Sequence, residues 1–190
     1  MPLKTLACLG LVVFLALCLG GDGLDSAQSL IVEDNWGPHV YVYRDAPQTI
    51  PDATNTVVVF EPAQGGADGD DLFDPAEPTM FTMPDYDAIY LITAQVCFDW
   101  PGGNGHCSVY IEEKTGDRDW ERRGAVRIPS PDAGQAMVSC VIVIGVNAGD
   151  HVRMVVRQTS GGPLDIVADQ YSRPKFSATF LRPQYCEVLP

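Results

Sequence analysis

From residue 40 onward the sequence consists of short runs of β-branched and aromatic side chains, each ended by Pro, Gly, Asn or Asp. Such runs are typical of strands, and no stretch repeats its apolar residues with the period of a helix. We predict nine strands, at residues 40–43, 56–60, 79–83, 89–98, 107–112, 125–128, 136–146, 152–158 and 176–181. The breakers between them include Pro101-Gly102-Gly103-Asn104-Gly105 and Ser160-Gly161-Gly162-Pro163, which are turn signals. The number and spacing of the strands predict an all-β sandwich or barrel.

The length and charge of the chain limit what it can be. Its 190 residues suffice for one domain with a single core. It carries 25 acidic and 12 basic side chains, a formal net charge of -13. This acid excess repels phosphate backbones and anionic lipid head groups, so we expect neither nucleic acid nor a membrane surface as a partner.

The first 21 residues differ from the rest of the chain. Lys4 precedes an apolar run at residues 6–19, and the small residues Gly20 and Gly21 follow it. The run is shorter than the about 20 residues that span a bilayer, so we predict a secretory signal peptide, with an uncleaved signal anchor as the alternative. The predicted division is a signal peptide at 1–21, an extension at 22–39, the β domain at 40–183 and a tail at 184–190. Without its signal peptide the chain is not expected to insert into a membrane.

Two of the predicted strands lack a polar outer face over part of their length. One face of strand 89–98 is apolar throughout, and Ile89 and Leu91 add apolar side chains to the opposite face. In strand 136–146, Val141 and Val143 do the same. A contiguous apolar patch on the outside of a sandwich usually marks an interface, so we expect copies of the chain to bury these four residues. The alternative is that residues 28–32 fold back over them.

Several short motifs occur in an order and at spacings that point to one domain family. They are Gln48-x-Ile50-Pro51-x-Ala53-Thr54-x-Thr56, Phe60, Phe81-Thr82-Met83-Pro84, Tyr90-Leu91-Ile92-Thr93-Ala94-Gln95-Val96, Ala148-Gly149-Asp150-x-Val152, Gln158-Thr159-Ser160-Gly161-Gly162 and Phe176-Ser177. Together they resemble the C1q/tumour-necrosis-factor-like (C1q/TNF-like) jelly-roll domain, most closely its collagen-free versions in bacteria and in phage tail or fibre proteins. The resemblance covers residues 40–182.

The resemblance implies a ten-strand antiparallel jelly-roll sandwich that assembles into a homotrimer. In the family, the strands matching residues 89–98, 136–146 and 176–181 belong to the sheet at the threefold axis. These include the two strands whose outer faces are apolar here. One motif departs from the family, because Ala88 stands where the family has a Gly before the aromatic residue, so that turn must differ. The chain also has no Gly-X-Y repeats, so no collagen stalk organises the trimer.

Residue types that could support catalysis are present but dispersed. His39, His106 and His151 lie in different segments, and neither a Gly-x-Ser-x-Gly nor a His-Glu-x-x-His motif occurs, so we expect no enzyme activity. The acidic segment 68–74 could bind calcium, since carboxylates are the hard oxygen ligands that this ion takes. It lacks EF-hand spacing, and a solvated loop is the alternative. We expect no other cofactor and assign no metal ligands.

The loop between strands 89–98 and 107–112 is the candidate binding site. It contains Asp99, Trp100, Asn104 and His106. An exposed Trp beside polar side chains can stack on a sugar ring or a cationic side chain while its neighbours fix the orientation. The alternative is a rigid Pro-Gly turn whose Trp packs on the rim of the sandwich.

Removal of the signal peptide leaves Cys97, Cys107, Cys140 and Cys186 as disulfide candidates. A bond between Cys97 and Cys107 would close the short loop that contains Trp100. Strand alternation raises a rival, because Cys107 and Cys140 both point inward from strands expected in opposite sheets. In that case Cys97 and Cys186 are free or intermolecular.

The sequence therefore predicts a secreted or extracellular module for recognition or adhesion that performs no catalysis. It would act as a homotrimer and bind a surface polymer, a glycan or a protein through its jelly-roll loops. The alternative is a structural building block of a virion surface or an extracellular assembly, in which the trimer itself is the functional unit.

Overall fold

The structure is a computed structural model that describes residues 39–61, 67–68 and 72–184. In these residues the chain is all β, as predicted, and contains no helix that could cross a membrane. Its strands are β1 (His39–Tyr43), β2 (Gln48–Ile50), β3 (Thr56–Val57), β4 (Ala67–Asp68), β5 (Phe81–Thr82), β6 (Ala88–Trp100), β7 (His106–Lys114), β8 (Glu121–Pro129), β9 (Gly134–Val146), β10 (His151–Gln158), β11 (Leu164–Ile166) and β12 (Lys175–Pro183).

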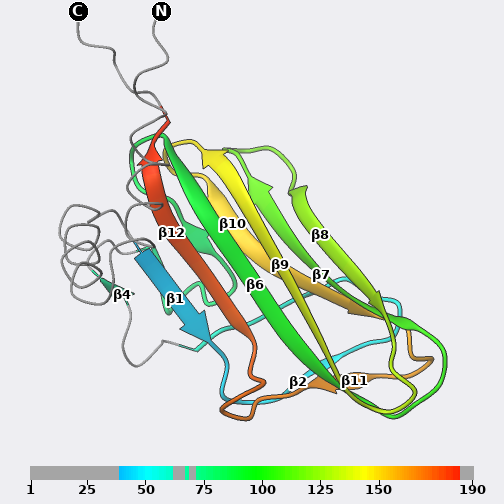
Figure 1. The fold of residues 1–190 in the computed structure, drawn as a ribbon. Helices are drawn as coiled ribbons and strands as arrows, with labels where there is room; N and C mark the ends of the chain where they lie inside the picture. The colour runs from blue at the N-terminus through cyan, green and yellow to red at the C-terminus, as the bar shows by residue number, and fades with distance from the viewer. Residues whose placement is uncertain (1–38, 62–66, 69–71, 185–190) are drawn as a thin grey trace, which may run out of the picture. The chain divides into compact units, whose positions relative to one another are not determined.

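The first sheet has seven strands and is organised around β6. One edge of β6 pairs with β9 along its whole length, from Ala88 opposite Val146 to Trp100 opposite Gly134. The other edge pairs with β12 and β11. From there the sheet continues through β12 to β1 and β4, and through β11 to β2 (Figure 1). Among the described strands, β9 is therefore at the edge of this sheet.

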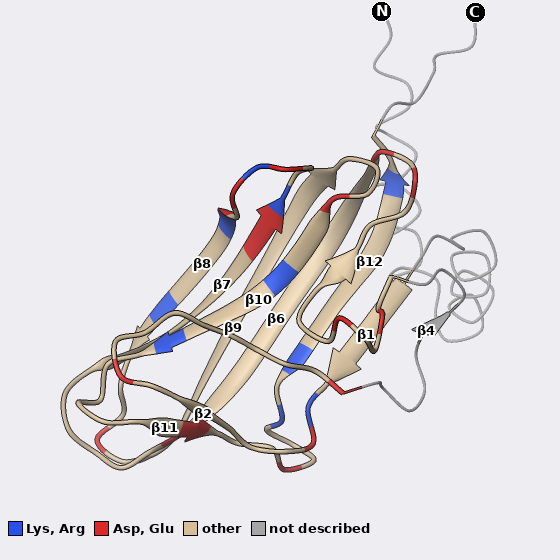
Figure 2. Ribbon diagram, turned by 180° about the vertical axis from the view of Figure 1, so that it is seen from behind, with Lys and Arg blue, Asp and Glu red and all other residues tan. Residues whose placement is uncertain are grey.

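The second sheet has five strands, with β10 between β7 on one side and the short β3 and β5 on the other. β8 pairs with the far edge of β7 and forms the edge of this sheet (Figure 2). Gly124 of β8 lies so close to β9 that a Cβ atom there would be 2.6 Å from the Ile142 side chain. The two edge strands thus meet along one side of the sandwich.

The chain crosses between the sheets repeatedly, which produces the jelly roll. It passes from β6 in the first sheet to β7 in the second, returns from β8 to β9, and crosses again from β9 to β10. The crossing from β6 to β7 is the loop 101–105, which carries part of the predicted binding site. Its position at one end of the sandwich follows from this topology.

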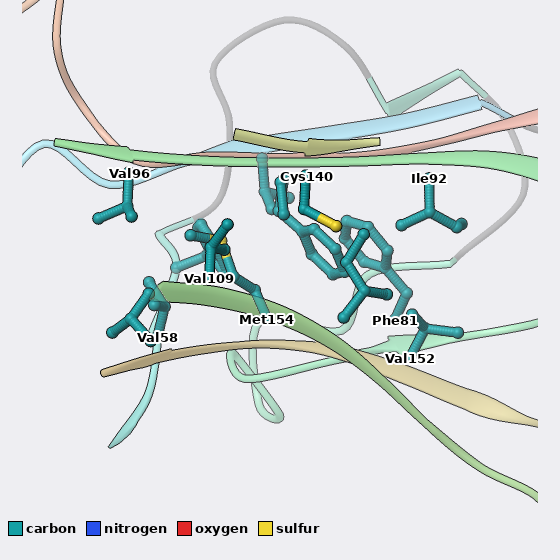
Figure 3. Close-up of a cluster of buried hydrophobic side chains, with 14 of the residues drawn as sticks. Val58, Phe81, Ile92, Val96, Val109, Cys140, Val152 and Met154 are labelled. Carbon is teal, nitrogen blue, oxygen red and sulfur yellow. The ribbon is translucent and has the colours of Figure 1, made fainter. Parts of the chain in front are cut away.

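The core lies between the two sheets, where the alternation along the strands predicts it. The predicted inward residues of β6 are all 1% exposed or less: Tyr90, Ile92, Ala94, Val96 and Phe98. Phe176 of β12 stacks on Phe81 of β5 with 4.4 Å between the ring centroids, which links the two sheets. Such a pair contributes about 0.5–1.5 kcal/mol beyond the apolar area that it buries. Figure 3 shows the layer of buried hydrophobic side chains that the two sheets contribute to the core.

The described residues form twelve strands, three more than the nine predicted from the sequence and two more than the ten that the resemblance implies. β2, β4 and β11 contain two or three residues each, too few to show alternation. β2 and β11 pair with each other, and Thr49 Oγ1 donates a hydrogen bond to Asp165 Oδ1 at 2.6 Å. β8 is also longer than predicted and begins at Glu121, because its charged residues continue the ladder to β7.

Candidate functional site

Trp100 is not the exposed stacking platform that the sequence predicts. β6 extends to Trp100, beyond its predicted end at Phe98, and strand alternation places both residues on the inward face. The Trp100 side chain is 2% exposed, and its Nε1 donates a hydrogen bond to the carbonyl oxygen of Gly103 at 3.4 Å. The stacking interpretation is therefore wrong, and the loop is a turn whose Trp is packed inside the sandwich.

The other three predicted binding residues do not form a unit. Asp99 and Asn104 are exposed, whereas His106 at the start of β7 is half-buried. Within the described chain, no hydrogen bond or ion pair joins any two of these three residues. What the loop does provide is a rigid end of the sandwich, since Ser130 Oγ donates to the Gly103 carbonyl at 3.0 Å.

His106 instead contacts Arg127 and Thr159, neither of which is predicted from the sequence as a site residue. Its Nδ1 lies 2.7 Å from Nη2 of Arg127 and 2.7 Å from Oγ1 of Thr159. Because a guanidinium can only donate, Nδ1 must accept, which leaves the hydrogen of the neutral ring on Nε2. Burial, together with the charges of Arg127 and Arg157, lowers the pKa of His106. Alternation places Arg127 and Arg157 on outer faces, and that sequence signal could have found them.

The outer face of the first sheet is apolar where the sequence predicts it. Val141 and Val143 of β9 are 61% and 59% exposed, and neighbouring Met137 is 48% exposed. Ile89 and Leu91 of β6 are only half-buried, and Leu91 lies directly opposite Val143. Residues 28–32, the alternative cover for this face, lie outside the described residues. The assignment of this face to a trimer contact stays a prediction.

The three cysteines that the structure describes are free thiols, so neither the Cys97–Cys107 nor the Cys107–Cys140 disulfide is formed. Cys97, Cys107 and Cys140 are all buried, while Cys186 lies outside the described residues. Cys107 faces the core from the second sheet, whereas Cys97 is on the outer face of the first. The Cys97 side chain therefore points away from the core that the Cys107 side chain enters, and two cysteines whose Cβ atoms do not face each other cannot be bridged. Cys140 also faces the core, as predicted, but is not bonded to Cys107.

The segment after β11 explains why Cys97 is buried although it points outward. Val167 donates its backbone N–H to the Cys97 carbonyl at 2.8 Å. Asp169 Oδ1 accepts the backbone N–H groups of Tyr171 and Ser172, each at 2.8 Å, and so shapes the turn. The resulting burial raises the pKa of the Cys97 thiol, which the hydroxyl of Ser172 contacts. Only the tertiary position of this turn removes Cys97 from the surface.

We expect the three described thiols to resist alkylation in the native protein. Burial raises the pKa of all three, and that of Cys107 to about 12, so they are protonated as well as covered at pH 8. In a variant with Cys8, Cys18 and Cys186 replaced by Ser, iodoacetamide should react at least about a hundredfold more slowly before unfolding than after it. Mass spectrometry reads the extent of labelling. Fast native labelling, or an unreduced mass lower by two hydrogens, would contradict the structure.

The described residues contain no cluster of side chains suited to a metal ion. No group of three or more His, Cys, Asp or Glu side chains in them could hold a metal ion. Residues 69–71 of the acidic segment 68–74, the predicted calcium site, lie outside the described residues, so calcium binding stays a prediction. The three histidines contact separate threonine hydroxyls, His39 with Thr179 at 2.9 Å, His106 with Thr159 at 2.7 Å and His151 with Thr82 at 3.2 Å. They lie on different strands, as expected from their dispersal in the sequence.

Comparison with known proteins identifies the fold. No protein-family model and no curated protein matches the sequence. Among solved structures, the crystal structure of murine APRIL at pH 5.0 matches with a TM-score of 0.58 and 14% sequence identity, over 75% of this chain and 98% of that one. APRIL has a jelly roll of the TNF family, so the likeness shows a TNF/C1q-like jelly-roll fold. The finer resemblance, to collagen-free bacterial and phage domains, stays a prediction.

Proposed function

We propose that the chain is a secreted, non-catalytic recognition or adhesion module that assembles into a homotrimer. Its ligand would be a surface polymer, a glycan or a protein, bound by exposed parts of the sandwich. The apolar run and small residues at 1–21 support secretion as a signal peptide. The jelly-roll likeness to murine APRIL supports the fold on which the assembly depends.

The contrast between the two edge strands carries the proposal. β9 has 13 residues, pairs with β6 without a bulge, and contains neither a charged residue nor a Pro. β8, at the edge of the second sheet, contains a glutamate, three arginines and a Pro, and its ladder with β7 has an irregularity at Glu112. Charges, Pro and bulges are how sheet edges avoid unwanted pairing. Apart from its contact with β9, β8 therefore has the features of an edge that faces water, and β9 has those of a strand that another chain covers.

The charge distribution supports contact through the first sheet, which contains β9. β1, β6, β9 and β12 contain a single carboxylate, Asp99, although the chain as a whole has 25 acidic residues. Copies with a net charge of -13 repel one another, and contact through a face with almost no carboxylates minimises that repulsion. We expect salt to strengthen the assembly, because it screens the acidic groups elsewhere.

Light scattering of the purified protein after gel filtration tests the proposal. The expected result is a particle of three chains at micromolar concentration, and a monomer would contradict the trimer. Electron microscopy of the native material then separates two roles of such a trimer. Free particles would support a recognition module, whereas an ordered array or a filament would support the structural building block.

A further inference from the structure

Five arginines lie on β8 and β10 of the second sheet, and three of them are neutralised. Arg153 and Arg122 both approach Glu112, at 2.8 Å and 3.9 Å. Arg123 pairs with Glu113 at 2.5 Å and with Glu121 at 3.3 Å. Figure 2 shows these basic segments along β8 and β10. The remaining two, Arg127 and Arg157, form no ion pair within the described residues.

Arg127 and Arg157, which form no ion pair in the described residues, lie on the two strands that flank β7. In the β-sheet register, Ser108 of β7 is the partner of Arg157 on β10 and of Arg127 on β8. The three residues therefore form one row, with about 4.8 Å between neighbouring strands. Both arginines also act on the same imidazole, since their charges contribute to the lowered pKa of His106. Two positive charges thus lie near the same imidazole in a strongly acidic chain.

The row contains hydrogen-bonding groups with no partner in the described part of the protein. Ser108 is 0% exposed, and its Oγ makes no hydrogen bond. The buried Nε of Arg157 makes none either. Arg127 uses one N–H for His106 Nδ1, and guanidinium groups have five. Unpaired buried polar atoms cost free energy, so their presence side by side points to a group that is bound there.

The chemistry of the row defines that group. Arg127 and Arg157 can only donate hydrogen bonds, Ser108 can donate one, and the neutral His106 ring carries its hydrogen on Nε2. A ligand must therefore supply negative charge and several acceptor oxygens close together. Sulfate and phosphate groups do so, and a guanidinium fork matches their geometry.

We propose that Arg127, Arg157, Ser108 and His106 form an oxyanion site that takes a sulfate or phosphate group of the ligand. This inference adds a ligand class to the proposed recognition function. It rests on that function only in taking the ligand to be a surface molecule. The site lies within a single chain, because all four residues belong to strands of its second sheet. A trimer would present three such sites and would hold a polyanionic polymer by avidity.

Titration with inorganic sulfate and inorganic phosphate, followed by the NMR signals of the His106 ring, tests the site directly. A saturable shift is expected with at least one of the two anions, and the stronger response identifies the group. Bound anion should also raise the pKa of His106, since it offsets the charges of the two arginines. In Arg127→Gln the affinity should fall roughly tenfold, as expected for the loss of one charge-assisted contact. Arg157→Gln gives a second, independent reading.

Arg118→Gln is the matched control for charge. Arg118 is exposed in the turn between β7 and β8, and its replacement changes the net charge equally. The control should bind like the wild type. Equal weakening in Arg118→Gln and Arg127→Gln, or no saturable shift with either anion, would overturn the proposal. Circular dichroism before each titration confirms that the variants are folded.

Dextran sulfate, with neutral dextran as its control, separates the site from the trimer. The wild type should bind dextran sulfate more tightly than inorganic sulfate, and a monomeric variant should lose this gain but keep the His106 response. A His106 response in a wild type that is monomeric would support the site and contradict the trimer. A trimer with no such response would support the trimer and overturn the site.

Discussion

The double substitution Val141→Asp and Val143→Asp should convert the trimer into monomers. Both side chains are more than half exposed in the single chain, so the fold should tolerate the change. In the assembly, burial of each valine is worth about 1.5–3 kcal/mol, and unpaired carboxylates at the same place add a further cost. The loss is at least about 3 kcal/mol for each contact between chains, which weakens association by at least about a hundredfold. Light scattering at several protein concentrations measures it.

A control with the same added charge distinguishes interface loss from general repulsion. Asn55→Asp with Gln170→Glu adds two negative charges at exposed loop positions. This variant should remain a trimer. A trimeric Val141→Asp/Val143→Asp protein would show that another face holds the chains together, and an unfolded one would show that the valines support the fold.

Gly105→Ala should destabilise the protein far more than Gly103→Ala in the same β6–β7 loop. A Cβ atom at Gly105 would lie 2.0 Å from the carbonyl oxygen of Thr159 and 2.9 Å from its carbonyl carbon. Both are backbone atoms, and the same strand end is tied to the loop by the hydrogen bond from Thr159 N to the His106 carbonyl at 3.0 Å. We expect the free energy of unfolding to fall by at least about 3 kcal/mol, a magnitude typical of overpacking at a rigid site. Denaturant unfolding measures this change.

Gly103→Ala is the control for backbone conformation. Gly103 has a φ of +94°, but a Cβ atom there would have no neighbour within 4 Å. Its replacement should cost only the about 1–2 kcal/mol of a left-handed alanine. Equal stability of the two variants would contradict the close approach at Gly105. Because Gly105 precedes His106, its substitution should also weaken sulfate binding, whereas Gly103→Ala should not.

The strand interiors were the part of the fold that the sequence could predict. Along β6, Tyr90 to Phe98 alternate between the core and the outer face as their residue types indicate, because the period of a strand is local and needs no knowledge of neighbours. The same reasoning identifies Val141 and Val143 as outward and Cys107 and Cys140 as inward. It also explains why β2 and β11 were missed, since their pairing depends on two segments that lie more than a hundred residues apart.

The candidate binding loop was less predictable, because exposure depends on what the fold places over a residue. Because Trp100 is followed by Pro101, the sequence predicts it as a loop residue. In the structure β6 continues to Trp100, and its ring is buried. Cys97 points outward as predicted, yet the turn around Asp169 covers it. Neither fact has a local signal.

By itself the sequence determined the fold class, the inward and outward sides of the long strands, the apolar patch on β6 and β9, and the strongly acidic charge. These properties follow from residue type and from a period of two, both of which act over a few residues. Only the tertiary structure decided that Trp100 is buried, that Cys97, Cys107 and Cys140 are unpaired, and which arginines are neutralised. Arg122 and Arg127 are chemically equal and lie on the same strand, and only the β-sheet register puts a glutamate beside one and Ser108 beside the other. Side-chain chemistry is local, but the partner that a charge meets is set by contacts between distant segments.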